Sequence, residues 1–226
     1  MENTCAAVIV AAGSATRMNG IDKVMSELGG IPMILRTVWA MAASKKINEI
    51  VVVTREDLIG PVTEACRNEK KFRVAIPGGS TRALSVMNGL KAVNTELVAI
   101  HDGARPFVTA KIIDDAVQTA SECGAAAPAV PVKDTIKVAE NHRIIGTPDR
   151  STLFAVQTPQ VFKRTKIVAA LQAAMQKQIP LTDDCSAAEA AGMEVILTEG
   201  SNENIKITTP VDLAFCEAIL KWREQH

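Results

Sequence analysis

The sequence contains no tyrosine, and its aromatic side chains are limited to two tryptophans and five phenylalanines in 226 residues. The formal net charge is zero, from 25 basic and 25 acidic side chains. Proteins that bind nucleic acid polymers use a basic surface and aromatic side chains that stack on bases. The composition therefore argues against a nucleic acid polymer as a partner.

Long apolar runs and paired cysteines are missing too. No apolar segment is long enough to cross a bilayer, and the N-terminus lacks the basic and apolar regions of a signal peptide. The cysteines are odd in number and never form a C-x-x-C pair, which argues against a disulfide framework or a zinc site. We expect a soluble cytoplasmic protein with buried thiols. The five cysteines are Cys5, Cys66, Cys123, Cys185 and Cys216.

Two common phosphate-binding patterns are also absent. The sequence has neither the G-x-G-x-x-G pattern of dinucleotide-binding proteins nor the G-x-x-x-x-G-K-[ST] pattern of the P-loop. It has instead an apolar run at residues 6–12 that ends at Gly13 and is followed by Arg17 and Lys23. The run predicts a buried strand, and a glycine with two nearby cations indicates a loop that binds polyphosphate. The alternative is a tight turn with both cations in solvent.

Strand and helix patterns alternate along most of the chain, which predicts an α/β fold with a mainly parallel, twisted sheet and helices on both faces. The length fits one domain, residues 1–226, better than two. We expect strands at residues 6–12, 47–54, 72–76, 97–102, 125–132 and 194–199, and a short extended segment at 204–210. We expect helices at residues 33–44, 83–92, 109–123, 164–177, 182–191 and 211–224, and a less regular helix that is interrupted at Gly60-Pro61.

A second loop with possible ligand contacts begins at Gly78-Gly79, between an expected strand and an expected helix. A glycine pair at this place lets a flat base lie against the backbone, near N–H groups and hydroxyls. The alternative is an ordinary loop in which Ser80 or Thr81 caps the helix.

A third motif is the acidic end of the strand at residues 97–102. Asp102 lies at the edge where open α/β sheets bind their ligands, so it is a candidate for contact with a ribose or with Mg²⁺. Arg105 can bind a phosphate through two parallel hydrogen bonds. The alternative is a helix-capping aspartate paired with Arg105. We expect His101 to be a packed strand residue rather than a metal ligand.

Residues 133–157 alternate apolar and polar side chains around Glu140-Asn141, as in an antiparallel hairpin with a return strand. An isolated hairpin is marginally stable in water, so we expect a second copy of the chain to cover this arm. The alternative is a hairpin folded back on its own sheet. Farther along, Asp183 and Asp184 fit a helix cap, whereas Lys206 reaches either the ligand or solvent.

Six blocks of sequence, taken together, carry a family resemblance. They are Ala11-Ala12-Gly13 with Arg17 and Lys23, Gly78-Gly79 with Arg82 and Ser85, residues 101–106, Thr158-Pro159-Gln160, Thr182-Asp183 and Asn204-Ile205-Lys206. In order and spacing they resemble the 2-C-methyl-D-erythritol 4-phosphate cytidylyltransferase family over nearly the whole chain. The resemblance implies a Rossmann-like nucleotidyltransferase fold, CTP and Mg²⁺ as co-substrate and metal, a homodimer joined through the β-arms, and a role in non-mevalonate isoprenoid biosynthesis.

The resemblance also implies roles for single residues. The family's catalytic and triphosphate-binding cations match Arg17, Lys23 and Lys206. Its nucleotide contacts match Ala12, Gly13, Gly79, Ser80, Ser85, Asp102 and Gly103, with Asp102 also near the metal. Its polyol phosphate contacts match Arg105, Thr158, Thr182 and Lys206, completed by Thr135 and Arg150 from the arm of a second copy. The chain departs from the family where Asp22 precedes Lys23 in a shortened loop, at Ser80 in place of an acidic residue, and at Gly103 in place of alanine.

The expected reaction is attack by a phosphate oxygen of the polyol phosphate on the α-phosphorus of CTP, with pyrophosphate as the leaving group. The attacking oxygen is already anionic near neutral pH, so the reaction requires cations and alignment but no general base. Three alternatives are a cytidylyltransferase for another polyol phosphate such as ribitol 5-phosphate, a sugar-1-phosphate nucleotidyltransferase, and a non-catalytic nucleotide-binding regulator. The phosphate loops of the sugar-1-phosphate enzymes are typically richer in glycine, which disfavours that alternative.

Overall fold

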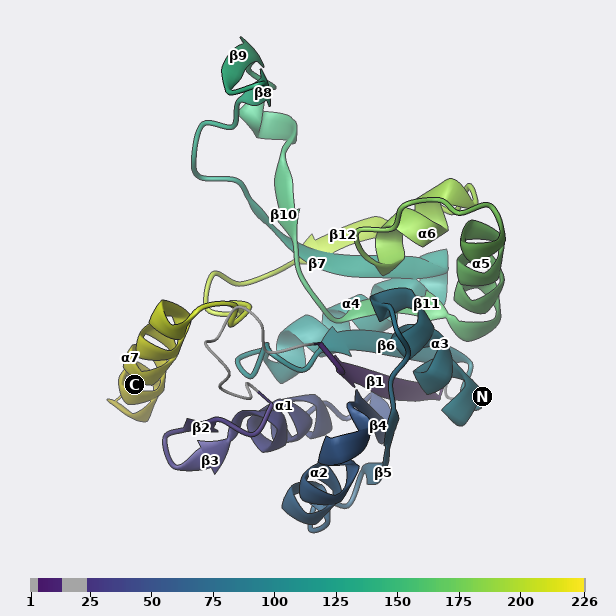
Figure 1. The fold of residues 1–226 in the computed structure, drawn as a ribbon, viewed down its shortest axis with the longest axis vertical. Helices are drawn as coiled ribbons and strands as arrows, with labels where there is room; N and C mark the ends of the chain where they lie inside the picture. Colours follow the sequence, from purple (N-terminus) through teal and green to yellow (C-terminus); the bar gives the residue numbers. More distant parts are fainter. Residues whose placement is uncertain (1–3, 14–23, 226) are drawn as a thin grey trace.

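The computed structural model describes residues 4–13 and 24–225. Over these residues the central sheet has eight strands, in the order β5-β4-β1-β6-β11-β7-β10, with β12 also paired to β7 (Figure 1). The strands are β1 (Cys5–Ala11), β4 (Ile47–Thr54), β5 (Phe72–Pro77), β6 (Leu97–Asp102), β7 (Ala125–Pro131), β10 (Phe154–Val156), β11 (Gln160–Lys163) and β12 (Ile196–Glu199). Only β10 and β11 pair antiparallel to their neighbours among these described strands, so the expected mainly parallel sheet is confirmed.

The sheet lies between two layers of helices because its central strands are apolar on both faces. Alternate residues of β1, such as Ala7 and Ile9, pack with α1 (Met33–Ala42), α2 (Ile59–Cys66) and α4 (Ala110–Cys123). Ala6 and Val8 face the opposite way and pack with α3 (Arg82–Ala92), α5 (Arg164–Gln176) and α6 (Asp184–Ala190). The core therefore consists of two apolar layers divided by the sheet.

A smaller apolar cluster fixes the C-terminal helix α7 (Pro210–Gln225). Cys216 of α7 is buried with Leu28, Met33 and Phe107, near the two-strand hairpin of β2 (Glu27–Leu28) and β3 (Ile31–Pro32). This cluster also contains Ile207, which directly follows Lys206. The packing of α7 therefore helps to position the segment that carries Lys206.

Several element predictions differ from the structure. The predicted interruption at Gly60-Pro61 is wrong, because α2 contains both residues; Pro61 lies in the first turn, where its missing N–H is not needed. The helix predicted over 33–44 ends at Ala42. The hairpin of β2 and β3 and the strand β11 were not predicted.

The predicted antiparallel hairpin at Glu140-Asn141 is confirmed as β8 (Val138–Glu140) paired with β9 (Arg143–Gly146). The turn residues Asn141 and His142 have positive φ angles of 47° and 63°, as a tight hairpin turn requires. The arm, residues 133–157, projects away from the sheet (Figure 1), and its return strand β10 pairs with β7. In the described part of the chain, no helix is both long and apolar enough to cross a membrane.

Candidate active site

A cavity of about 460 Å³ opens at the carboxyl ends of the parallel strands. β1 has β4 on one side and β6 on the other, and this reversal of strand order is where α/β sheets form ligand sites. Val10 of β1 lies opposite Asp102 of β6 in the strand register. The lining residues from these strand ends and nearby loops include Ala12, Gly13, Gly79, Ser80, Thr81, Arg82, Ser85, Asp102, Gly103 and Lys206. We call this space the edge cavity.

The glycine loop approaches β1 so closely that a side chain would not fit. A Cβ atom on Gly78 would lie 2.4 Å from the Cβ of Ala12, and one on Gly103 would lie 2.8 Å from the Cβ of Ala11. Contacts this short require the backbone to move. The loops that carry Ala12, Gly78 and Gly103 therefore form a continuous backbone wall beside the edge cavity.

Hydroxyl groups hold the remainder of this loop in place. Ser85 Oγ accepts a hydrogen bond from the Gly79 N–H at 3.0 Å, and Thr81 caps α3 by accepting from the Leu84 N–H. Thr81, one of the two proposed caps, is thus confirmed as the N-cap. Ser80 lines the edge cavity. The same loop therefore caps α3 and lines the edge cavity. The two interpretations of this loop, as a helix cap and as a ligand contact, are compatible.

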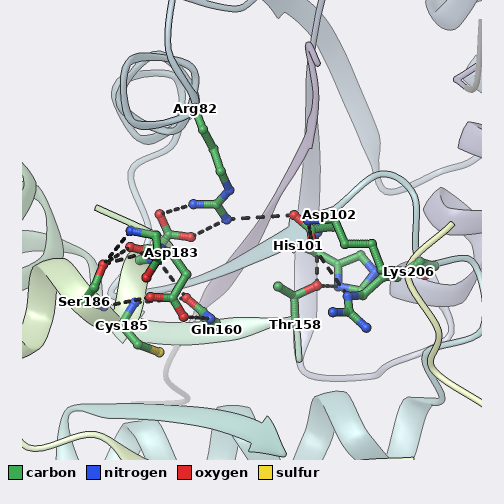
Figure 2. A network of polar contacts seen from close by, with 12 residues as sticks. Arg82, His101, Asp102, Thr158, Gln160, Asp183, Cys185, Ser186 and Lys206 are labelled. Carbon is green, nitrogen blue, oxygen red and sulfur yellow. Dashed lines mark hydrogen bonds and ion pairs between the residues drawn. The ribbon is translucent and has the colours of Figure 1, made fainter. Parts of the chain in front are cut away.

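Asp102 lies at the centre of a cluster of cations, which we call the Asp102 cluster: Asp102, Arg82, Arg105 and Lys206. Its Oδ2 is 2.8 Å from Lys206 Nζ and 3.5 Å from Arg105 Nε, and its Oδ1 is 3.9 Å from Arg82 Nη2 (Figure 2). Burial alone raises the pKa of Asp102, but the charge and hydrogen bond of Lys206, followed by Arg82 and Arg105, lower it overall below the ordinary value. Asp102 is therefore ionised near neutral pH and shared among three cations.

Arg82 connects this cluster to a second carboxylate. It donates two parallel hydrogen bonds to Asp184, from Nη1 at 2.9 Å and from Nη2 at 2.7 Å. Asp184 is almost fully buried, and its backbone N–H donates to Gln160 Oε1. No role was predicted for Arg82, although it belongs to one of the blocks that carry the family resemblance. Its place after the glycine pair is a usable signal, but Asp184 is 102 residues away and nothing local indicates that pair.

Asn204 fixes the segment that carries Lys206. It is fully buried, and its Nδ2 donates to Gln157 Oε1 at 3.1 Å and to the Thr158 carbonyl at 3.0 Å. Arg105 in turn donates from Nη1 to the Asn204 carbonyl. The side chain of Lys206, 45% exposed, reaches the edge cavity from this anchored segment.

The predicted site residues do not all lie at the edge cavity. Thr158 is buried behind Asp102, with its hydroxyl hydrogen-bonded to His101 and to the Asp102 N–H. Thr182 lines a neighbouring cavity of about 280 Å³ instead. Thr135 and Arg150 are exposed on the arm. Arg17 and Lys23 lie outside the described residues, so their predicted roles stay predictions.

Known proteins resemble this chain in both sequence and fold. The sequence profile of the 2-C-methyl-D-erythritol 4-phosphate cytidylyltransferase family matches residues 5–222. A relative with that name from Caldanaerobacter subterraneus is 45% identical over 95% of this chain and 98% of its own. The solved structure of 4-diphosphocytidyl-2C-methyl-D-erythritol synthase from Anaerococcus prevotii is 30% identical, with a TM-score of 0.88 over 98% of this chain and 100% of that one. The cytidylyltransferase structure from Thermus thermophilus has a TM-score of 0.78 at 30% identity over 95% of this chain and 98% of its own.

Proposed function

Since the chain belongs to the 2-C-methyl-D-erythritol 4-phosphate cytidylyltransferase family, we propose that the edge cavity is the place where its reaction occurs. The enzyme transfers a cytidylyl group from CTP to 2-C-methyl-D-erythritol 4-phosphate and releases pyrophosphate. This is a step of non-mevalonate isoprenoid biosynthesis.

The observation that carries the site assignment is the Asp102 cluster at the edge of the sheet. Three cations, Arg82, Arg105 and Lys206, lie within 4 Å of one ionised carboxylate. Arg82 is also paired with Asp184, so the three cations share two carboxylates and one positive charge is left over next to the edge cavity. Two phosphate-bearing substrates would supply the missing negative charge.

The nucleotide fits the backbone wall of the edge cavity. The wall at Ala12, Gly13 and Gly79 presents main-chain groups without bulky side chains, which suits a flat base and a triphosphate. Gly103 extends the same wall beside Asp102. We assign the cytidine half of CTP to this wall and its ribose to the neighbourhood of Asp102, with Ser80 and Ser85 as further contacts of the loop.

The transfer is a direct displacement at phosphorus. A phosphate oxygen of the polyol phosphate forms a bond to the α-phosphorus of CTP, and the bond from the α-phosphorus to its bridging oxygen breaks. The electron pair of that bond leaves with pyrophosphate. We assign to Lys206 the neutralisation of charge that develops on these oxygens, and to Arg105 the binding of the acceptor phosphate. Arg17 and Lys23 complete the set of cations in this proposal.

The metal proposed for this site is Mg²⁺. Among the described residues, no three histidine, cysteine or acidic side chains are grouped to hold a metal ion by themselves. Mg²⁺ is commonly held by one or two carboxylates together with substrate phosphates, and the ionised Asp102 at the cavity wall fits that set. When bound there, the ion would neutralise charge on the phosphate oxygens.

The arm is proposed to join two copies of the chain. Its exposed apolar side chains include Ile144 and Ile145, 66% and 57% exposed, and such residues are stabilised by a partner surface. Thr135 and Arg150 lie on the same arm, away from their own edge cavity. We assign them to the acceptor site of the second copy. We expect the enzyme in the cytoplasm, where its five free cysteines stay reduced.

The experiment that tests this function offers the purified protein CTP with Mg²⁺ and one acceptor at a time. The acceptors are 2-C-methyl-D-erythritol 4-phosphate and ribitol 5-phosphate, and pyrophosphate release is followed in both. We expect release with the methylerythritol phosphate and with CTP, and little with UTP or ATP. A preference for ribitol 5-phosphate would contradict the acceptor assignment, and CTP binding without any release would contradict catalysis.

A further inference from the structure

His101 is a buried, titratable residue that the proposed reaction does not use. It lies on β6 directly before Asp102 and has no solvent exposure. Its Nε2 is 3.0 Å from the Arg105 carbonyl oxygen, and its Nδ1 is 2.9 Å from Thr158 Oγ1. The ring therefore contacts the backbone of Arg105, the proposed acceptor-binding residue. Through Thr158 it is also linked to the backbone of Asp102, the proposed ribose contact.

The chemistry of these partners determines the direction of every hydrogen bond. A carbonyl oxygen only accepts, so Nε2 carries the proton and donates to Arg105. The Thr158 oxygen accepts from a backbone N–H, so the hydroxyl proton is directed to Nδ1; Nδ1 therefore accepts, and the ring is neutral. Thr158 Oγ1 in turn accepts from the Asp102 N–H at 3.1 Å. One continuous chain of donors thus runs from Asp102 through Thr158 and His101 to Arg105.

This chain holds the turn from Asp102 to Arg105 at both ends. Within the turn, the Arg105 N–H donates to the Asp102 carbonyl at 3.1 Å. The His101 ring adds the link from the other side, where its Nε2 holds the Arg105 carbonyl close to β6. A turn fixed at both ends presents its two side chains in one orientation, and these side chains are the carboxylate and one of the cations of the Asp102 cluster.

We propose that His101, as the neutral tautomer protonated at Nε2, is a positioning residue that sets Arg105 for the acceptor phosphate. The inference rests on the proposed function of Arg105 and goes beyond it, since His101 itself touches no substrate. It also explains why the hydroxyl of Thr158 is turned away from the edge cavity. The hydroxyl donates its one proton in the hydrogen bond to His101 Nδ1, and its oxygen accepts from the Asp102 N–H. The hydroxyl therefore links the ring to Asp102 and is not available to donate to a ligand.

Three substitutions separate the two hydrogen bonds of the ring. His101→Asn keeps an acceptor near the Nδ1 position but loses the donor to Arg105, whereas His101→Gln keeps a donor near the Nε2 position. His101→Phe keeps the ring volume and loses both bonds. Arg105→Ala serves as the benchmark for loss of the acceptor-binding cation. For each variant, kcat and the KM of both substrates are measured by pyrophosphate release, together with thermal unfolding.

We expect His101→Asn and His101→Phe to raise the KM of the polyol phosphate about tenfold, because a buried carbonyl has lost its donor and the turn is released. The KM of CTP should stay within about twofold, because the backbone wall is untouched. His101→Gln should restore most of the acceptor affinity. The proposal is overturned if the variants unfold more easily but keep both wild-type KM values, or if His101→Gln and His101→Asn behave alike.

A second measurement tests the tautomer without relying on activity. In ¹⁵N-labelled protein, the ring nitrogens of His101 should show a protonated Nε2 and an unprotonated Nδ1 at neutral pH. A proton on Nδ1, or on both nitrogens, overturns the proposal. If Arg105→Ala leaves the acceptor KM unchanged, the assignment of Arg105 to the acceptor is wrong, and the positioning role of His101 is overturned with it even where the tautomer is as expected.

Discussion

Removing the guanidinium of Arg82 leaves a buried carboxylate without its partner. Asp184 has a side-chain exposure of 1%, and both of its oxygens accept from Arg82, at 2.9 and 2.7 Å. Arg82→Met keeps most of the length and the apolar stem of the side chain but removes the charge. We expect this variant to lose about 3 kcal/mol of unfolding free energy, the lower end for a broken buried pair, because Arg82 is 33% exposed and admits water.

The loss of unfolding free energy in Arg82→Met should depend on pH. Burial already raises the pKa of Asp184, while the charge and hydrogen bonds of Arg82 oppose that effect. Without Arg82 the pKa rises further above its value in the unfolded chain. A carboxyl group with a raised pKa destabilises the fold where it is ionised, and this penalty shrinks as the pH falls toward the unfolded pKa. Arg82→Met should therefore be less destabilised at about pH 5 than at about pH 8.

Urea unfolding at the two pH values is the assay, with Asp184→Asn and the double variant completing a cycle. The double variant should lose less than Arg82→Met alone, because no unpaired charge remains buried. Two results refute the reasoning. One is a loss below about 1 kcal/mol in Arg82→Met, and the other is a loss of the same size at both pH values.

Three further predictions concern activity. Lys206→Ala should lower kcat at least about 10²-fold in pyrophosphate release while the thermal midpoint changes little, because a preorganised cation is lost; near-normal turnover would contradict its role. Gly78→Ala should weaken CTP binding in calorimetry, because its Cβ would lie 2.4 Å from that of Ala12, whereas Gly60→Ala, with nothing within 4 Å, should bind CTP normally. Arg150→Ala should raise the KM of the polyol phosphate but not of CTP, and equal effects on both substrates would argue against its acceptor role.

The elements that the sequence predicts well have local signals at both ends. The helix predicted over 109–123 begins after the Thr109 cap and ends at Gly124, whose φ is 100°. Strand β4 was predicted at its observed bounds because its run of valines suits a strand buried on both faces. β11 was missed because it has only four residues, and its place between β6 and β7 depends on partners far away in the sequence.

The same distinction between local and distant signals applies to the site. The position of Asp102 at the end of its strand follows from local pattern, and the structure places it at the edge cavity with Lys206. The pair of Arg82 and Asp184 depends on the tertiary arrangement of α3 and α6, both of which pack against α5, and no local pattern gives it. The place of Thr158, between β10 and β11, is also a tertiary result, because its partner His101 is 57 residues away on β6.

The most direct test of the central claim follows the α-phosphorus of CTP. The protein is incubated with CTP labelled at that phosphorus, Mg²⁺ and 2-C-methyl-D-erythritol 4-phosphate, and the products are separated. We predict that all transferred label enters the cytidylyl polyol product, that pyrophosphate carries none, and that Lys206→Ala slows the appearance of labelled product. Label in free CMP with no transfer to the polyol, or equal rates in the wild type and Lys206→Ala, would contradict the account.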